Sequence, residues 1–131
     1  MIVVDTNVIA YLMLPGDLTA AAEALLESEP DWVAPPLWKS EFRSILAGYM
    51  RRGTLSLQQA TEIQTAAEDL LAGNEINPES KAILQRVAES PCSAYDCEFV
   101  ALAQQLECAL YTMDTKVLNA FPKTAKSLRK P

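Results

Sequence analysis

The stretch Met1-Ile2-Val3-Val4-Asp5-Thr6-Asn7-Val8-Ile9 decides how the fold of this chain is interpreted. The aliphatic run at residues 2–4 predicts a short strand buried on both faces, because branched side chains pack well on a pleated surface. Asp5 ends this strand, and Thr6 and Asn7 are residue types that begin helices. Open α/β sheets bind ligands where strands end and helices begin. Asp5 is therefore either a ligand-binding residue or a helix cap, and this stretch alone leaves both interpretations open.

Length and residue usage restrict the possible chemistry. The chain has 131 residues, and we expect one domain over residues 1–131. It contains no histidine, which excludes mechanisms that use imidazole, such as Ser-His and Cys-His nucleophiles. Cys92, Cys97 and Cys108 match no zinc-binding spacing and are expected to be reduced thiols of a cytoplasmic protein. No apolar run approaches the roughly 20 residues of a membrane span, so no membrane association is expected.

The charge is distributed unevenly along the chain. The net charge is −6, but residues 116–131 carry five basic residues and no acid, which leaves −11 on the remainder. A basic segment on an acidic body can attract phosphate groups. A solvated tail that serves only solubility explains the same charges, and this alternative stays open.

Proline, glycine and short polar residues divide the chain into alternating segments. Helices are expected over residues 6–14, 17–29, 37–52, 56–71, 79–89 and 115–121, and another that begins at residue 93. Strands are expected at 32–34 and 109–113, with weaker strand signals at 75–77 and 125–128. No repeat or linker divides this pattern.

Three further acids stand in positions like that of Asp5. Asp114 ends the strand at 109–113 just as Asp5 ends the first one. Glu41 falls on the apolar stripe of the helix at 37–52, where a charge is costly unless it is paired or reaches the rim. Asp96 lies in line with the apolar stripe of its helix, although Ser93 three residues earlier also makes it a capping-box acid.

These four carboxylates are expected to face one crevice, because strand ends and the first turns of neighbouring helices meet along one edge of such a sheet. Clustered acids raise one another's pKa and destabilise a fold, so a cluster indicates a positive ligand. Ligands that are all oxygen favour Mg²⁺ or Mn²⁺ over zinc or copper. Such an ion supports hydrolysis at phosphorus, since it orients water and neutralises phosphate charge.

The order of motifs along the whole chain resembles the PIN-domain nucleases, and within them the toxin ribonucleases of VapBC-type toxin–antitoxin pairs. The residues that carry the resemblance are Val-Val-Asp-Thr-Asn at 3–7, Glu41 after a proline-containing turn, Ser-Ala-Tyr-Asp at 93–96 and Leu-Tyr-Thr-Met-Asp at 110–114. The resemblance implies an α/β fold, a three-layer α/β/α sandwich with a mostly parallel central sheet of about 4–5 short strands. It also implies a Mg²⁺- or Mn²⁺-dependent endoribonuclease.

The resemblance assigns roles to particular residues. The catalytic acids are Asp5, Glu41, Asp96 and Asp114, and the ion is held by Asp5, Asp96 and Asp114. Thr6, Asn7 and Thr112 are expected to support them. Lys116, Lys39 and Arg43 are expected to bind the substrate. Many relatives carry a further acid where this chain has Lys116, so one strong metal site is predicted rather than two.

The expected partners follow from the same resemblance. They are a structured RNA such as transfer RNA, a small antitoxin that blocks the acidic pocket, and a second copy of the chain that packs through the helices between residues 37 and 71. Cleavage by water would leave a 5′-phosphate and a 3′-hydroxyl.

Other functions remain alternatives. A PIN-like domain that binds RNA or a protein without cleavage has the same pattern. A phosphoacceptor receiver domain is less favoured, because it needs paired acids after the first strand and a mid-chain aspartate at a strand end. A haloacid-dehalogenase-like phosphatase would need an aspartate where Asn7 stands.

Overall fold

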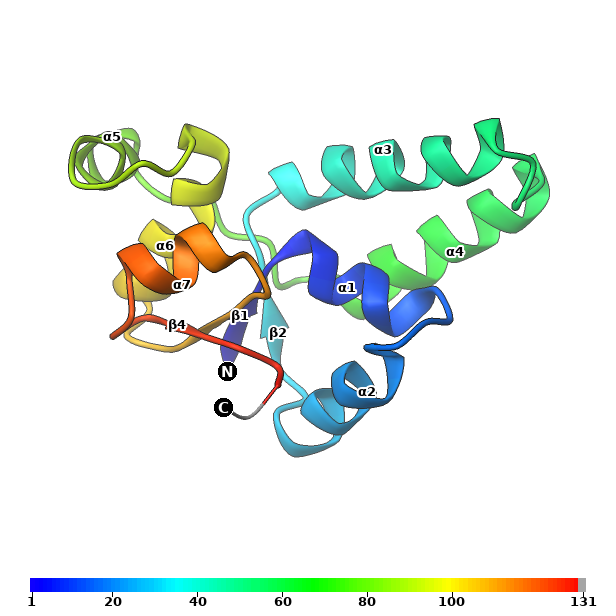
Figure 1. Ribbon diagram of the computed structural model, residues 1–131, viewed down its shortest axis with the longest axis horizontal. Helices are drawn as coiled ribbons and strands as arrows, with labels where there is room; N and C mark the ends of the chain where they lie inside the picture. Colours follow the sequence, from blue (N-terminus) through cyan, green and yellow to red (C-terminus); the bar gives the residue numbers. More distant parts are fainter. Residues whose placement is uncertain (130–131) are drawn as a thin grey trace.

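The structure is a computed structural model that describes residues 1–129, and it has a four-stranded sheet at its centre (Figure 1). The strands are β1 (Ile2–Val4), β2 (Trp32–Val33), β3 (Leu110–Tyr111) and β4 (Ala125–Lys126). Their order is β2-β1-β3-β4, and every neighbouring pair is parallel. This confirms the α/β fold with a parallel sheet of short strands.

Seven helices connect and cover the strands over residues 1–129. They are α1 (Thr6–Met13), α2 (Thr19–Ser28), α3 (Leu37–Arg51), α4 (Leu57–Leu70), α5 (Ser80–Ala88), α6 (Ala94–Gln105) and α7 (Thr115–Ala120). The expected helices are all present, and their boundaries differ from the predicted ones by at most two residues. Ser56 and Ser93 cap α4 and α6 through complete capping boxes, which explains why these two starts are clear in the sequence.

The helices form two layers, one on each side of the sheet. In Figure 1, α1 to α4 lie on one side of β1 and β2, and α5 to α7 lie on the other. The chain crosses from β1 to β2 in one direction and from β3 to β4 in the opposite direction. Because parallel crossovers are right-handed, these two connections must lie on opposite faces. The strand order therefore reverses between β1 and β3, which is where such sheets form a ligand crevice.

The core is built from the strands and from one stripe of each packed helix. Val3 and Val4 are fully buried in β1, and Trp38, Phe42 and Leu46 form the inward stripe of α3. The rings of Trp38 and Phe42 lie 5.9 Å apart between centroids. Burial of each such side chain contributes roughly 1.5–3 kcal/mol, which fixes α3 against the sheet. Glu41, next to Phe42, is thereby carried toward the interior on a helix that cannot rotate away.

The weak strand signal at 75–77 is realised only as an isolated parallel bridge between Ala34 and Glu75. This bridge brings the Glu75 carboxylate to the start of α3. There it accepts a hydrogen bond of 2.8 Å from the Trp38 indole and forms an ion pair of 3.0 Å with Lys39. The segment thus fastens the beginning of α3 rather than extending the sheet.

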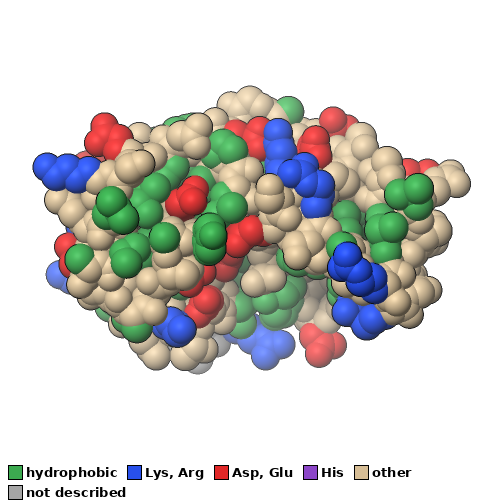
Figure 2. All heavy atoms as spheres, turned by 90° about the horizontal axis from the view of Figure 1, so that it is seen from above, with side chains coloured by type: hydrophobic (Ala, Val, Ile, Leu, Met, Phe, Trp, Pro, Cys, Tyr) green, Lys and Arg blue, Asp and Glu red, His purple; other side chains and the backbone are tan. Residues whose placement is uncertain are grey.

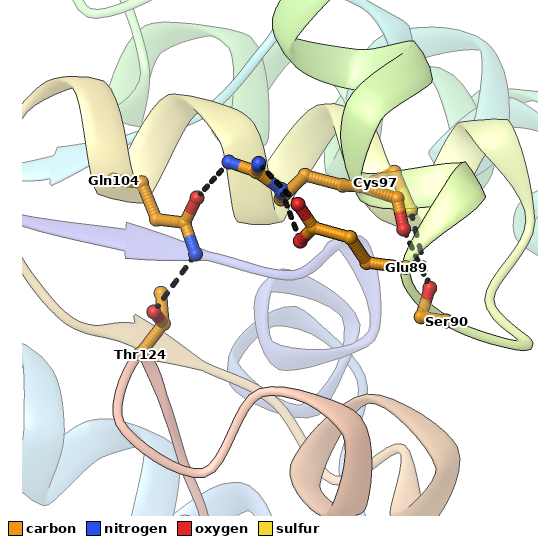
Figure 3. A network of polar contacts seen from close by, with 6 residues as sticks. Glu89, Ser90, Cys97, Gln104 and Thr124 are labelled. Carbon is orange, nitrogen blue, oxygen red and sulfur yellow. Dashed lines mark hydrogen bonds and ion pairs between the residues drawn. The ribbon is translucent and has the colours of Figure 1, made fainter.

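A polar network joins α5 to the rest of the fold (Figure 3). Arg86 on α5 pairs with Glu89 at 2.9 Å and donates to the Gln104 side chain on α6 at 2.7 Å. Gln104 donates in turn to Thr124, just before β4, at 3.3 Å.

Over residues 1–129, none of the helices combines the length and apolar character that crossing a membrane requires.

Candidate active site

The four acids singled out in the sequence line one pocket. Asp5, Glu41, Asp96 and Asp114 come from the end of β1, from α3, from the first turn of α6 and from the residue after β3. They surround a cavity of about 520 Å³. The pocket lies where the strand order reverses, at the carboxyl ends of β1 and β3. Residues more than a hundred positions apart in the chain are therefore brought to one crevice by the parallel pairing of these strands.

Asp5 is held by a threonine that directly follows the neighbouring strand β3. It occupies the N-cap position of α1, yet its side chain makes no capping hydrogen bond. Instead, one carboxylate oxygen accepts a hydrogen bond of 2.8 Å from the Thr112 hydroxyl, which is buried. The same hydroxyl accepts from the Asp114 backbone N–H at 3.0 Å. Thr112 thus links the acids at the two strand ends, and Asp5 is not a side-chain cap.

Glu41 is held in a similar way by the first residue of α1. The buried Thr6 hydroxyl donates to one Glu41 oxygen at 2.7 Å, which joins α1 to α3. Asn7, the third predicted supporting residue, is exposed and lines the pocket without a hydrogen bond to the acids. Of the predicted supports, Thr6 and Thr112 therefore contact a carboxylate directly.

Asp96 and Asp114 each serve as a helix cap. One Asp96 oxygen accepts from the Ser93 N–H at 3.4 Å, which completes the capping box of α6. One Asp114 oxygen accepts from the N–H groups of Lys116 and Val117, at 2.9 and 3.4 Å. In both carboxylates, and in Glu41, the second oxygen has no hydrogen-bond partner within residues 1–129. Capping orients these side chains and leaves one oxygen of each available.

Burial raises the pKa of Asp5 from its ordinary value of 3.8 to about 6. The Thr112 hydrogen bond acts in the opposite direction, and the negative charge of Glu41 raises the Asp5 pKa further. Burial is also the main reason that the pKa of Glu41 is raised, with a smaller contribution from the charge of Asp96. The clustering of acids in the sequence predicts raised carboxylate pKa values, and the pKa values of Asp5 and Glu41 are raised. Burial, however, contributes more to the rise than the charges of the neighbouring acids do.

The donor set suits a hard divalent cation in its chemistry. The anionic groups that line the pocket are all carboxylates, and none of the four acids forms an ion pair within residues 1–129. In that part of the chain, however, no three acidic or cysteine side chains are arranged so that they could hold one metal ion together. The predicted ligand set Asp5, Asp96 and Asp114 lines the pocket without converging on one point.

The predicted substrate-binding residues lie outside the pocket lining. Lys39 is paired with Glu75, and Arg43 contacts Ser40 at 3.1 Å and lines a separate groove between α3 and α4. The Lys116 side chain is exposed and does not line the pocket. The basic residue that does is Arg52, at the end of α3, which the sequence interpretation missed. Its spacing of eleven from Glu41, three helical turns, is the signal that places both on one side of α3.

Figure 2 views the molecule from above Figure 1. Acidic side chains gather near the middle of this face, and several basic side chains lie over its right half, where Figure 1 places α3 and α4. The charge asymmetry on this face therefore comes from the body of the domain and not only from the basic segment at the end of the chain.

The protein has a parallel sheet between two helical layers and four carboxylates that form no ion pair within residues 1–129, in the crevice where the strand order reverses. These features define a class of α/β proteins built around an acidic pocket. Residues 2–126 match the PIN domain family, and the chain belongs to this family. The resemblance seen in the sequence is thus confirmed at the level of the family.

Solved structures share the fold at low sequence identity. A crystal structure of PAE2754 from Pyrobaculum aerophilum has a TM-score of 0.78 and 17% identity, and the alignment covers 97% of this chain and 90% of that one. FitAcB from Neisseria gonorrhoeae has a TM-score of 0.75 and 21% identity, with 98% of each chain covered. A toxin–antitoxin complex from Klebsiella pneumoniae has a TM-score of 0.68 and 22% identity, with both chains fully covered. No curated protein matches the sequence significantly.

Proposed function

We propose that this protein is a Mg²⁺- or Mn²⁺-dependent endoribonuclease and the toxin of a cytoplasmic toxin–antitoxin pair. The observation that carries the proposal is the meeting of Asp5, Glu41, Asp96 and Asp114, from four distant segments, in one pocket without a cationic partner within residues 1–129. Family membership supports nuclease chemistry. The similar structure described as a toxin–antitoxin complex, from Klebsiella pneumoniae, supports the toxin role and a small antitoxin as partner.

Each acid has a place in the proposed mechanism. Asp5, Asp96 and Asp114 would hold the divalent ion, which would neutralise phosphate charge and make water a better nucleophile. Glu41 is the proton acceptor, because one of its oxygens is fixed by Thr6 and its pKa is raised by burial. Water attacks phosphorus, its proton passes to the free Glu41 oxygen, the bond to the ribose 3′-oxygen breaks, and the departing 3′-oxygen takes a proton from solvent. The products are a 5′-phosphate and a 3′-hydroxyl.

The test is RNA cleavage by the purified protein with Mg²⁺ or Mn²⁺, on transfer RNA as the structured substrate. Asp5→Asn is expected to lower the cleavage rate by at least about 100-fold, the order of effect seen when a charge-stabilising group is removed from an active site. The matched control is Asp69→Asn, which removes an exposed carboxylate of α4 outside the pocket and should cleave as the wild type does.

A second measurement separates cleavage from ion binding. Mg²⁺ should raise the melting temperature of the wild type but not that of Asp5→Asn, since an ion that binds only the folded state stabilises it. Cleavage unaffected by Asp5→Asn would contradict the proposed site.

Expression of the protein alone should arrest growth, and Asp96→Asn should relieve the arrest. Ion binding and RNA binding with no cleavage would favour the alternative, a PIN-like domain that binds RNA without cutting it.

A further inference from the structure

Arg52 is the one basic side chain that lines the acidic pocket, among those that residues 1–129 contain. It is the C-cap residue of α3, and its backbone N–H donates to the Gly48 carbonyl at 3.2 Å. The side chain folds back along the helix, so that a guanidinium nitrogen lies 3.3 Å from where a β-carbon on Gly48 would stand. The cation therefore sits level with Gly48, about 10 Å along the helix axis from Glu41.

Two neighbours hold the guanidinium in this position. Its central carbon lies 4.7 Å from the centroid of the Tyr49 ring, within the range of a cation–π contact. The absence of a side chain on Gly48 leaves the space that the guanidinium occupies. Arg52 is thus held on the helix surface even though its residue is exposed to solvent.

The guanidinium is not neutralised by the acids that share its pocket. Within residues 1–129, no carboxylate lies within ion-pairing distance of Arg52. An arginine offers a planar set of N–H donors that matches two oxygens of one phosphate. The Arg52 guanidinium lies about 10 Å from Glu41 along the helix axis. It can therefore contact a neighbouring phosphate of an RNA strand whose reacting phosphate lies at the four acids.

The pocket continues beyond Tyr49 into a second cavity of about 340 Å³. The two cavities share Asn7, Ile45 and Tyr49, and the second extends past Tyr11 to the turn between α1 and α2. A path with one cation and two tyrosine rings is typical of sites for unpaired nucleic acid, where phosphates meet positive charge and bases stack on aromatic rings.

We propose that Arg52, held over Tyr49 and above Gly48, binds the phosphate next to the one that is cut, and that unpaired nucleotides follow the groove toward Tyr11. This inference rests on the proposed ribonuclease function and names the part of the RNA that the pocket accepts. A structured RNA would therefore be bound at a loop or an unpaired end rather than along a helix.

The first experiment measures binding without cleavage. In an Asp5→Asn background, the affinity for a fluorescent single-stranded RNA of mixed sequence is measured over a range of salt concentrations. Arg52→Gln should weaken binding severalfold and lower the slope of log affinity against log salt by about 0.7, the value for one lost phosphate contact to a single strand. The matched control is Arg51→Gln, which removes the same charge from the preceding, exposed residue and should leave the slope unchanged.

The same assay tests the groove. A duplex RNA of the same length should bind more weakly than the single strand, and Tyr11→Ala should reduce the preference between them. Equal slopes for Arg52→Gln and Arg51→Gln would overturn the assignment of Arg52. Equal binding of duplex and single strand would overturn the assignment of the groove.

The second experiment uses the active protein. Arg52→Gln should raise KM with little change in kcat, because a phosphate beside the reacting one is bound equally in the ground and transition states. Arg52→Lys should recover part of the loss. Failure of the wild type to cleave RNA would refute the ribonuclease function but leave the binding result for Arg52 intact, so the two proposals fail separately.

Discussion

For Asp5, the sequence leaves two roles open, that of a helix cap and that of a ligand-binding residue. Asp5 stands at the N-cap position of α1, but its carboxylate accepts a hydrogen bond from Thr112, which directly follows the adjacent strand, and caps nothing. Asp96 and Asp114 differ from Asp5, because the side chain of each accepts a capping hydrogen bond at the start of its own helix and also lines the pocket. The two roles are compatible, since one carboxylate oxygen satisfies the helix and the other is left for a ligand.

The raised pKa of Asp5 predicts a dependence of stability on pH. Because the pKa of Asp5 is raised to about 6 in the folded state, the folded state binds the Asp5 proton more tightly than the unfolded state does. The stabilisation that results is fully present below about pH 4 and is lost as the pH rises through about 6. The loss amounts to roughly 2–3 kcal/mol. Asp5→Asn cannot ionise, so without divalent ions it should be more stable than the wild type at pH 7.5 and similar to it at pH 4.

This prediction is checked by urea denaturation in the presence of a chelator at both pH values. Asp69→Asn serves as the control, because it removes a carboxylate that is exposed on α4. A lower stability of Asp5→Asn at pH 7.5 would mean that the carboxylate is needed for the fold itself, as an essential structural acceptor for Thr112 would be.

At the scale of elements, α3 determines most of the geometry of the site. Its buried stripe of Trp38, Phe42 and Leu46 fixes its rotation, and this places Glu41 and Arg52 in the same pocket. Its beginning is fastened through Glu75 to the segment that follows α4. The helix ends at Arg51, and Gly53, just beyond its C-cap, has a φ of 77°, a left-handed conformation that glycine adopts without strain.

Two glycines at this end of α3 are expected to respond in opposite ways to alanine. A β-carbon on Gly48 would meet only the flexible end of Arg52, so Gly48→Ala should stabilise the helix by about 0.5–1 kcal/mol. Gly53→Ala should destabilise the protein by about 1 kcal/mol, because its backbone conformation is unfavourable for a residue with a side chain. Urea denaturation of the two variants measures both changes, and a shift in the same direction for both would contradict the assigned helix end.

At the scale of the whole molecule, an apolar groove lies between α3 and α4, away from the acidic pocket. It encloses about 440 Å³ and is lined by apolar residues that include Leu46, Met50 and Leu57. The Leu57 side chain is 71% exposed. The resemblance to PIN-domain toxins implies a homodimer that packs through these helices, and an exposed apolar groove at this position is compatible with such an interface.

The homodimer stays a prediction, and one substitution tests where it forms. Leu57→Glu should convert the dimer to a monomer in light scattering coupled to size exclusion, because it would bury a charge in the interface. Leu84→Glu changes an exposed leucine of α5 on the opposite helical layer and should leave the dimer intact. Dissociation by Leu84→Glu alone would place the interface on the other side of the molecule.

The sequence by itself determined the elements and the positions of the acids within them. Capping boxes at Ser56 and Ser93, glycine at the end of α3 and aliphatic runs before Asp5 and Asp114 are signals that act within a few residues. Such local signals are independent of how the elements later pack. For this reason the helices could be predicted from the sequence, whereas the parallel sheet and the PIN family were implied by the resemblance that the order of motifs along the whole chain carries.

Only the tertiary structure decided which charges face the acids. Lys39 was expected to bind RNA, but the bridge between Ala34 and Glu75 gives it a carboxylate partner from a segment far along the chain. The spacing of Arg52 from Glu41 places both on one side of α3, but Arg52 reaches the pocket only because the buried stripe sets the rotation of α3 and Gly48 leaves room for its side chain. Long side chains are placed by packing and pairing between distant segments, which is the information that local sequence patterns do not contain.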